Sequence, residues 1–327
     1  MSAPPRPGSA PEGRSGMKLF GWQGITCLLP EDWDLTGVTG TEREGYFSFD
    51  DERMRRMEIK YARARRWGQP ALEKTLTYYF DSVRKKLKKG TRFEIEEDAK
   101  LIGTERIPQE YRWKAYGWVS DFIARGVIWH CEVCRRVVIA QCLAAPNRVN
   151  LREISDILAS LRCHPEGEER TWAAFDFAVD VPKEMHLETH KLQAGLISLS
   201  FVHKNARLVV DRLGMAHAVL RHTPMDRYVK EVHYKKLRRR RLRFIEEAWK
   251  GHPGFRIEGA RFRVLYWLPR VGPLLRKWRT GDHIGGRVWH CEEANRLFII
   301  RAEGKNAQDL ADRAAASIQC HESLATE

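Results

Sequence analysis

The sequence lacks the common signatures of a nucleotide-binding or hydrolytic enzyme. It has no glycine-rich phosphate loop ending in Lys-Ser or Lys-Thr, no dinucleotide-binding glycine pattern after a strand, and no Gly-x-Ser-x-Gly. Nothing in it nominates a nucleophile together with a base. We therefore favour a non-enzymatic protein without a cofactor over an enzyme.

Long apolar runs are also missing. No segment approaches the length needed to span a bilayer, and the start of the chain has no apolar stretch of the kind found in signal peptides. Residues 1–16 are mainly Pro, Gly, Ser, Ala, Arg and Glu, which cannot repay the entropy lost on ordering, so we predict a disordered tail there. These features predict a cytoplasmic protein.

Cysteines are few and odd in number, and basic residues outnumber acidic ones. Seven cysteines without a secretion signal predict reduced thiols rather than a disulfide framework. The formal net charge of +14 favours anionic partners. A length of 327 residues, 43% of them hydrophobic, leaves room for two domains with ordinary cores.

One unusual motif is present twice. Trp-His-Cys-Glu occurs at 129–132 and at 289–292, and a Cys-His pair follows about thirty residues later, at 163–164 and 320–321. Because Trp, His and Cys are uncommon residues, the repetition predicts an internal duplication. We place the two copies at residues 17–166 and 167–323.

Further landmarks repeat in the same order along the chain. The basic segment 85–89 matches 235–239 at a spacing of 150 residues, and Phe-Glu-Ile-Glu at 93–96 matches Phe-Arg-Ile-Glu at 255–258 at a spacing of 162. The increase predicts an insertion in the second copy, within residues 240–253, that extends a basic helix.

Hydrophobic periodicity predicts the same elements in each copy. In the first, alternating strands precede an apolar stripe with helical spacing over residues 69–89, more strands follow, and a short helix over 151–161 closes the copy. Short turns between strands imply antiparallel pairing. The sequence therefore predicts an α+β fold: two tandem copies of a mainly antiparallel sheet packed with helices, in the order strands, helix, strands, helix.

The start of the first copy has a further resemblance. A strand ending in Leu-Leu-Pro-Glu-Asp-Trp at 28–33, a hairpin, a central helix and a terminal helix resemble the α/β sandwich of the PsbP and Mog proteins. The resemblance is one of element order and implies a binding or accessory module rather than a catalyst. It assigns no functional residue, and the Cys-His pairs are not part of it.

Alternation along a strand divides the repeated motif. Trp129 and Cys131 point to one face, which we expect to be packed, and His130 and Glu132 point to the other, nearer solvent. Adjacent His130 and Cys131 cannot easily join one metal site. We expect Cys131 to lie against Cys163, and Cys291 against Cys320, as buried thiols; a disulfide and a metal site are the alternatives.

Cys131 and Cys134 have the spacing of a redox or metal motif. The second copy has Ala294 where the second cysteine would stand. A function shared by both copies therefore cannot depend on Cys134, and we predict no metal ligand among these residues.

Basic residues provide the candidate contact surface. Seven adjacent cations repel one another unless an anion neutralises them, so a helix carrying them predicts binding to nucleic acid or to an acidic protein. The candidates are Lys235, Lys236, Arg238, Arg239, Arg240, Arg241 and Arg243, with a weaker group at Lys85, Lys86, Lys88 and Lys89.

A rival hypothesis places function between the two copies. His130 with Glu132, and His290 with Glu292, could line an inter-domain cleft of an enzyme or of a small-ligand-binding protein. Convergence of these four side chains on one pocket would favour that hypothesis.

Overall fold

The structure is a computed structural model that describes residues 16–64, 70–232, 241–260 and 283–321. The chain divides into two compact units, Met1–Asp176 (unit 1) and Phe177–Glu327 (unit 2), which are described separately. This division falls ten residues after the predicted boundary at Glu166, because strand β10 (Glu169–Ala174) pairs with β1 (Met17–Trp22) inside unit 1. None of the described helices is long and apolar enough to cross a membrane.

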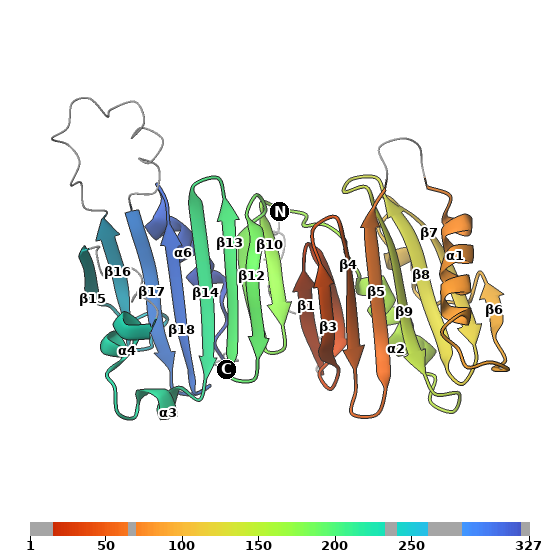
Figure 1. The fold of residues 1–327 in the computed structure, drawn as a ribbon, viewed down its shortest axis with the longest axis horizontal. Coiled ribbons are helices and arrows are strands. Elements are labelled where there is room, and N and C mark those ends of the chain that lie inside the picture. The colour runs from red at the N-terminus through yellow and green to blue at the C-terminus, as the bar shows by residue number, and fades with distance from the viewer. Residues whose placement is uncertain (1–15, 65–69, 233–240, 261–282, 322–327) are drawn as a thin grey trace, which may run out of the picture. The chain divides into compact units, whose positions relative to one another are not determined.

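Unit 1 is built on a seven-stranded antiparallel sheet with the order β3-β4-β5-β9-β8-β7-β6 (Figure 1). Inward-facing Phe47 and Ile59 are fully buried and alternate with more polar positions, which explains why their segments form strands. Val138 is equally buried, but it stands between the apolar Val137 and Ile139. The strands are β3 (Asp34–Gly40), β4 (Glu44–Asp50), β5 (Arg55–Arg63), β6 (Glu94–Glu97), β7 (Tyr111–Val119), β8 (Ile123–Cys131) and β9 (Arg136–Ala144).

Unit 2 has a seven-stranded antiparallel sheet with the order β12-β13-β14-β18-β17-β16-β15, which is the order of unit 1 shifted by nine strands. The register agrees as well, because Trp129 lies opposite Val138 and Trp289 lies opposite Phe298. The strands are β12 (His186–Gln193), β13 (Leu196–His203), β14 (Ala206–Gly214), β15 (Arg241–Glu246), β16 (Gly254–Ala260), β17 (His283–Cys291) and β18 (Arg296–Glu303).

Helices cover both faces of each sheet. In unit 1, α1 (Leu72–Arg84) and α2 (Leu151–Ser160) lie on opposite faces of the sheet; in unit 2, α4 (Met225–Val232) and α6 (Ala307–Ser317) do the same (Figure 1). Short segments complete the units: β2 (Ile25–Pro30), which pairs with β1, the 3-10 helix η1 (Thr104–Arg106), β11 (Phe177–Pro182) and α3 (Ala216–Leu220).

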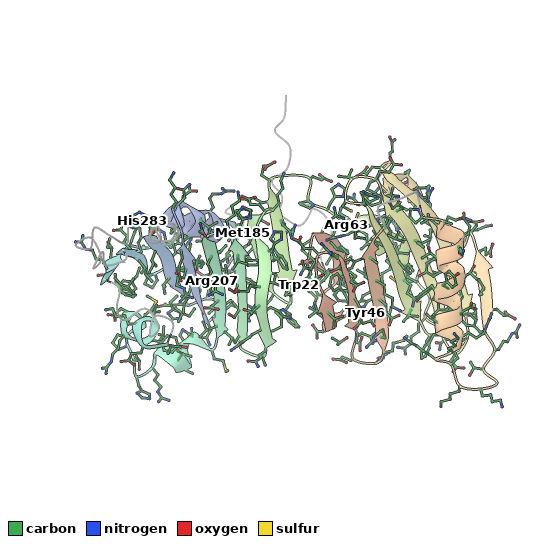
Figure 2. All side chains as sticks on the ribbon, turned by 45° about the horizontal axis from the view of Figure 1, so that its top comes forward. Trp22, Tyr46, Arg63, Met185, Arg207 and His283 are labelled. Atoms are coloured by element: carbon green, nitrogen blue, oxygen red, sulfur yellow. The ribbon has the colours of Figure 1, made fainter. Side chains whose placement is uncertain are left out.

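The sheet face beside α1 carries a polar group. Tyr46 on β4 donates a hydrogen bond of 2.6 Å to Glu58, and Gln141 donates a second one of 3.0 Å to the same carboxylate (Figure 2 labels Tyr46). Burial, and then the hydrogen bond to Glu58, raise the pKa of Tyr46 to about 12. The Glu58 carboxylate is therefore paired inside the fold, by the Tyr46 hydroxyl and the Gln141 amide.

The predicted α+β class is wrong, because the protein is mostly β. The described residues form eighteen strands and five α-helices. The sequence analysis did not predict β3 or most of β12 as strands. Both are edge strands that expose residues on both faces, so hydrophobic alternation is weak in them. The predicted central helix over 69–89 is shorter, ending at Arg84.

The structure describes only the two ends of the predicted basic helix of unit 2. Met225–Val232 form helix α4, residues 233–240 lie outside the described residues, and Arg241–Glu246 form strand β15 where the prediction continues the helix. The match between 93–96 and 255–258 was wrong, because Glu94–Glu97 form the edge strand β6, whereas Gly254–Ala260 form β16, which takes the place of β7 in the strand order. The supposed insertion within 240–253 therefore includes strand β15, the counterpart of β6.

Candidate metal centres

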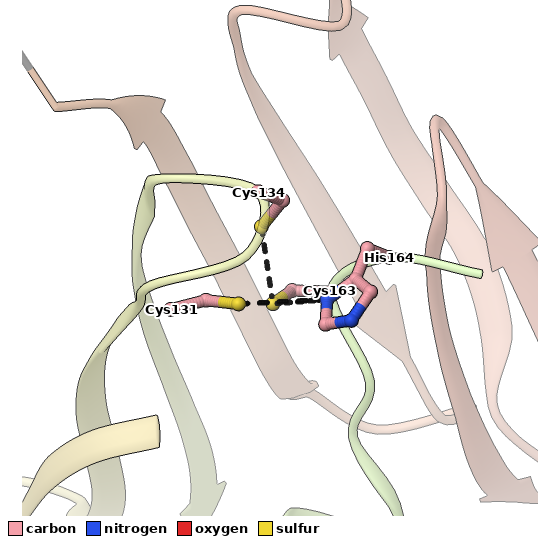
Figure 3. Close-up of side chains that lie close together, drawn as sticks. All are labelled: Cys131, Cys134, Cys163 and His164. Atoms are coloured by element: carbon pink, nitrogen blue, oxygen red, sulfur yellow. Dashed lines mark hydrogen bonds between the residues drawn. The ribbon is translucent and has the colours of Figure 1, made fainter. Parts of the chain in front are cut away.

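Four potential metal ligands meet in unit 1. Cys131 is the last residue of β8, Cys134 lies in the turn between β8 and β9, and Cys163 and His164 follow the end of α2. We name these four residues cluster 1. The ligand atoms all lie within 4.8 Å of one another, and Figure 3 shows their side chains pointing toward a common centre.

A second set meets in unit 2. Cys291 is the last residue of β17, Cys320 and His321 follow the end of α6, and His252 lies in the turn between β15 and β16. We name these four residues cluster 2. Three of its positions repeat those of cluster 1 in the fold, and the fourth comes from another element.

The distances in both clusters fit a tetrahedral ion. With metal–sulfur bonds of about 2.3 Å, the edges of a tetrahedron measure about 3.8 Å, and edges to nitrogen are slightly shorter. In cluster 1, the Sγ atoms of Cys134 and Cys163 are 3.5 Å apart, and Cys131 Sγ is 3.5 Å from His164 Nδ1. In cluster 2, Cys320 Sγ is 3.3 Å from His252 Nε2 and 3.4 Å from His321 Nδ1.

The fourth ligand changes place between the clusters. In unit 1, Tyr111 on β7 lies opposite Cys131. In unit 2, Gly254 lies opposite Trp289, and continuing this antiparallel register by two residues places His252 opposite Cys291. The turn position that holds Cys134 in unit 1 holds Ala294 in unit 2. Unit 1 thus combines Tyr111 with Cys134, unit 2 combines His252 with Ala294, and each unit keeps four ligands.

The thiols of cluster 1 share protons. Hydrogen bonds from Cys134, and then from Cys163, hold the pKa of Cys131 far below that of a free thiol, and the same contact with Cys131 raises the pKa of Cys163. A lowered pKa favours the thiolate of Cys131, and the thiolate is the form that binds metals.

Cluster 2 is less charged. Burial raises the pKa of Cys320, and burial followed by repulsion from His321 lowers the pKa of His252. His252 is consequently neutral near pH 7, as a metal-ligating imidazole must be. Two thiolates and two imidazoles would neutralise a divalent cation, whereas the three thiolates of cluster 1 would leave one negative charge.

Neighbouring groups orient the ligands of cluster 2. His321 turns Nδ1 toward the sulfurs while its Nε2 lies 3.2 Å from a carboxylate oxygen of Glu293, the arrangement that fixes the tautomer of many metal-bound histidines. Lys250 donates hydrogen bonds of 2.8 and 2.6 Å to the carbonyls of Ala316 and Ile318, at the end of α6. The turn that carries His252 is thereby fastened beside the helix end that leads to Cys320.

Other contacts support cluster 1. The indole N–H of Trp129 donates to Cys163 Sγ at 3.4 Å, and the Tyr111 hydroxyl accepts the backbone N–H of Cys163 at 3.0 Å. The buried guanidinium of Arg136 donates to the Cys163 carbonyl at 3.0 Å. In unit 2 the indole N–H of Trp289 has no hydrogen-bond partner among the described residues.

The structure buries Trp129 and Cys131, as strand alternation predicts, and it places Cys131 with Cys163 and Cys291 with Cys320. All seven cysteines are thiols in the structure. His130 belongs to neither cluster, but at 7% exposure it is buried rather than near solvent.

The four residues of the rival cleft hypothesis do not form a group within either unit. His130 and His290 are buried in strands β8 and β17, while Glu132 and Glu292 are exposed in the following turns. Burial is the main reason that the pKa values of both histidines are lowered.

The predicted basic residues are only partly described. Lys85, Lys86, Lys88 and Lys89 are exposed at and after the end of α1, and Arg243 is exposed on β15. Arg241 begins β15. Lys235, Lys236, Arg238, Arg239 and Arg240 lie outside the described residues.

Sequence reasoning missed Cys134 and His252 as partners of the repeated Cys and Cys-His positions. Cys134 was discounted because Ala294 replaces it, and His252 was hidden because β16 was matched to the wrong strand of the first copy. A search for any Cys or His that compensates for Ala294 in the second copy would have found His252.

No protein-family model and no curated protein matches the sequence. Among solved structures, the chain is similar to the apo form of TplEi, a T6SS immunity protein from Pseudomonas aeruginosa, with 14% identity, a TM-score of 0.36, and coverage of 93% of this chain and 96% of that one. TplEi in complex with the "L" peptide gives 12% identity, a TM-score of 0.32, and coverage of 94% and 99%. Since both TM-scores are below 0.5, neither similarity identifies the fold or the function of this chain.

Proposed function

We propose that the protein is a non-enzymatic tandem module of two duplicated domains, in which each domain binds one structural zinc ion. Cys131, Cys134, Cys163 and His164 hold the first ion, and His252, Cys291, Cys320 and His321 hold the second. Closed sets of four Cys and His ligands are typical of structural zinc sites, whereas catalytic zinc keeps a position open for water.

The observation that carries this proposal is the exchange of the fourth ligand. If the cysteines were only small buried apolar groups, Ala294 could replace Cys134 without any change elsewhere. Instead, unit 2 has His252 in the place of Tyr111, and its Nε2 reaches Cys320. Preservation of four ligands through a paired change is what metal coordination requires.

Each ion would fasten the segment after the last helix of its unit to the end of a central strand. In unit 1 this joins the residues after α2 to the β8–β9 turn. In unit 2 it joins the residues after α6 to β17 and to the β15–β16 turn. A cytoplasmic location, predicted from the sequence, would keep the thiols reduced for this role.

The partner of the module is proposed to be anionic, either nucleic acid or an acidic protein. The net charge of +14 and the exposed lysines after α1 support such a partner. Replacing Lys85, Lys86, Lys88 and Lys89 together with Gln should weaken binding to a nucleic-acid probe and flatten its salt dependence; unchanged binding would remove these lysines from the contact surface.

The zinc proposal is tested by elemental analysis of the purified chain under reducing conditions. We expect two equivalents of zinc, and removal with a strong chelator should lower the melting temperature, with recovery on adding zinc back. Cys142→Ala is a matched control, because Cys142 is a buried thiol on β9 outside both clusters and should leave the zinc content unchanged. A chain without bound metal, or one whose melting temperature ignores the chelator, would contradict the proposal.

A further inference from the structure

The two clusters differ in how well their thiols are shielded. Cys134 is partly exposed in the β8–β9 turn, next to Val133, which is 65% exposed. Both thiols of cluster 2 are shielded, because Cys291 is 0% and Cys320 is 4% exposed. An oxidant in solution can therefore reach a sulfur of cluster 1 much more easily than a sulfur of cluster 2.

A second thiol, that of Cys163, lies in contact with the accessible thiol of Cys134. Cys163 Sγ lies 3.5 Å from Cys134 Sγ, which is van der Waals contact for two sulfurs, and Cys163 is completely buried. A partly exposed thiolate next to a resolving cysteine is the arrangement of peroxide-sensitive sites, and coordination to zinc would hold Cys134 as a thiolate. The turn that carries Cys134 is short and faces solvent, since Glu132 and Val133 are exposed.

We infer that cluster 1 is a peroxide-sensitive zinc site that releases its ion when Cys134 and Cys163 are oxidised, while cluster 2 retains its ion. This inference rests on the proposed function and assigns regulation to one of its two sites. The oxidant is hydrogen peroxide or an organic hydroperoxide.

The reaction balances in two steps. The Cys134 thiolate attacks one peroxide oxygen, the O–O bond breaks, hydroxide leaves, and Cys134 becomes a sulfenic acid. The Cys163 thiolate then attacks the Cys134 sulfur, a second hydroxide leaves, and a disulfide forms. Two thiolates lose two electrons and peroxide gains them; the zinc ion, left with Cys131 and His164, passes to solvent.

The same chemistry is hindered in unit 2. The position equivalent to Cys134 is Ala294, and the fourth ligand is the imidazole of His252, which peroxide does not convert to a disulfide partner. Oxidation of cluster 2 would have to begin at a shielded sulfur. The two centres in one chain therefore provide an internal comparison.

The test follows zinc release from the purified, zinc-loaded full-length chain with a colorimetric chelator during exposure to hydrogen peroxide. We expect one equivalent to be released about tenfold faster than the other, and peptide mapping of the product should show a Cys134–Cys163 disulfide. Reduction and zinc should restore the starting state.

Two matched variants keep four ligands in every cluster. Tyr111→His with Cys134→Ala gives unit 1 the ligand set of unit 2 and should abolish the fast phase. His252→Tyr with Ala294→Cys gives unit 2 the set of unit 1 and should make both equivalents fast. If one of the two variants fails to fold, the other still decides.

The outcomes separate this inference from the proposed function. A chain that carries no zinc before peroxide is added contradicts both. A chain that carries two equivalents and releases them at equal rates, or forms no disulfide involving Cys134, leaves the zinc sites intact as a proposal and overturns the redox inference.

Discussion

The metal centre of unit 1 and that of unit 2 share three positions in the fold and differ in the fourth. In both, one cysteine ends a central strand, and a Cys-His pair follows the last helix. The fourth ligand is Cys134 from a turn on one side of the strand in unit 1, and His252 from the neighbouring hairpin in unit 2. The comparison teaches that the number of ligands is kept while their source in the fold is free to change.

The different fourth ligand also changes which segments of the chain each proposed ion would join. In unit 1 the fourth ligand lies three residues from Cys131, so the ion joins only two segments of chain. In unit 2 the fourth ligand comes from the β15–β16 turn, so the ion joins three segments. We therefore expect cluster 2 to contribute more to the order of its edge hairpin than cluster 1 does.

The largest effects should come from the shared cysteines. Cys163→Ala and Cys320→Ala should each remove one equivalent of zinc and destabilise the corresponding unit by about 4 kcal/mol, because a closed site loses its ion and leaves buried ligands unpaired. Zinc content and chemical denaturation check this. Loss of both equivalents from either single variant would show that the two centres are not independent.

A smaller effect on zinc affinity should come from the carboxylate that orients His321. Glu293→Gln should weaken zinc binding by cluster 2 by about tenfold, since the carboxylate next to His321 Nε2 no longer raises the basicity of the ring. Competition with a chelator of known affinity measures the change. Cluster 1 serves as the control, and a change of equal size there would contradict the assignment of Glu293 to cluster 2.

The smallest effect should come from the tryptophans. Trp129→Phe removes the indole N–H that donates to Cys163, whereas Trp289→Phe removes an N–H without a hydrogen-bond partner among the described residues. Both variants leave a similar gap, so the difference in unfolding free energy should be about 1 kcal/mol, with Trp129→Phe the less stable. Equal losses of unfolding free energy in the two variants would show that the hydrogen bond from Trp129 to Cys163 does not stabilise unit 1.

Much of the local structure was predictable from the sequence. The apolar stripe from Leu72 to Val83 predicted a helix where α1 lies, and alternation correctly predicted that Trp129 and Cys131 are buried. The fold class was not predictable from these patterns, because exposed edge strands such as β12 carry little hydrophobic alternation. Long-range pairing decides whether such segments join a sheet.

The metal centres illustrate the same limit. The repeated Cys and Cys-His positions mark three members of each cluster, although the sequence analysis predicted buried thiols and no metal ligand there, and the fourth member depends on the register between strands. Strand β7, with Tyr111 opposite Cys131, corresponds to strand β16 and the His252 that precedes it. The two segments differ so much in sequence that only the hydrogen-bond register aligns them. Dismissal of Cys134 followed from comparing positions one at a time rather than as a set of ligands.

The most direct test of the account is the zinc content of a half-exchanged and a fully exchanged unit 2. His252→Tyr alone should lose the second equivalent, and His252→Tyr with Ala294→Cys should regain it, since Cys replaces the missing ligand from the turn. Equal zinc content in these two variants, whether both bind one equivalent or both bind two, would contradict the claim that four ligands hold each ion.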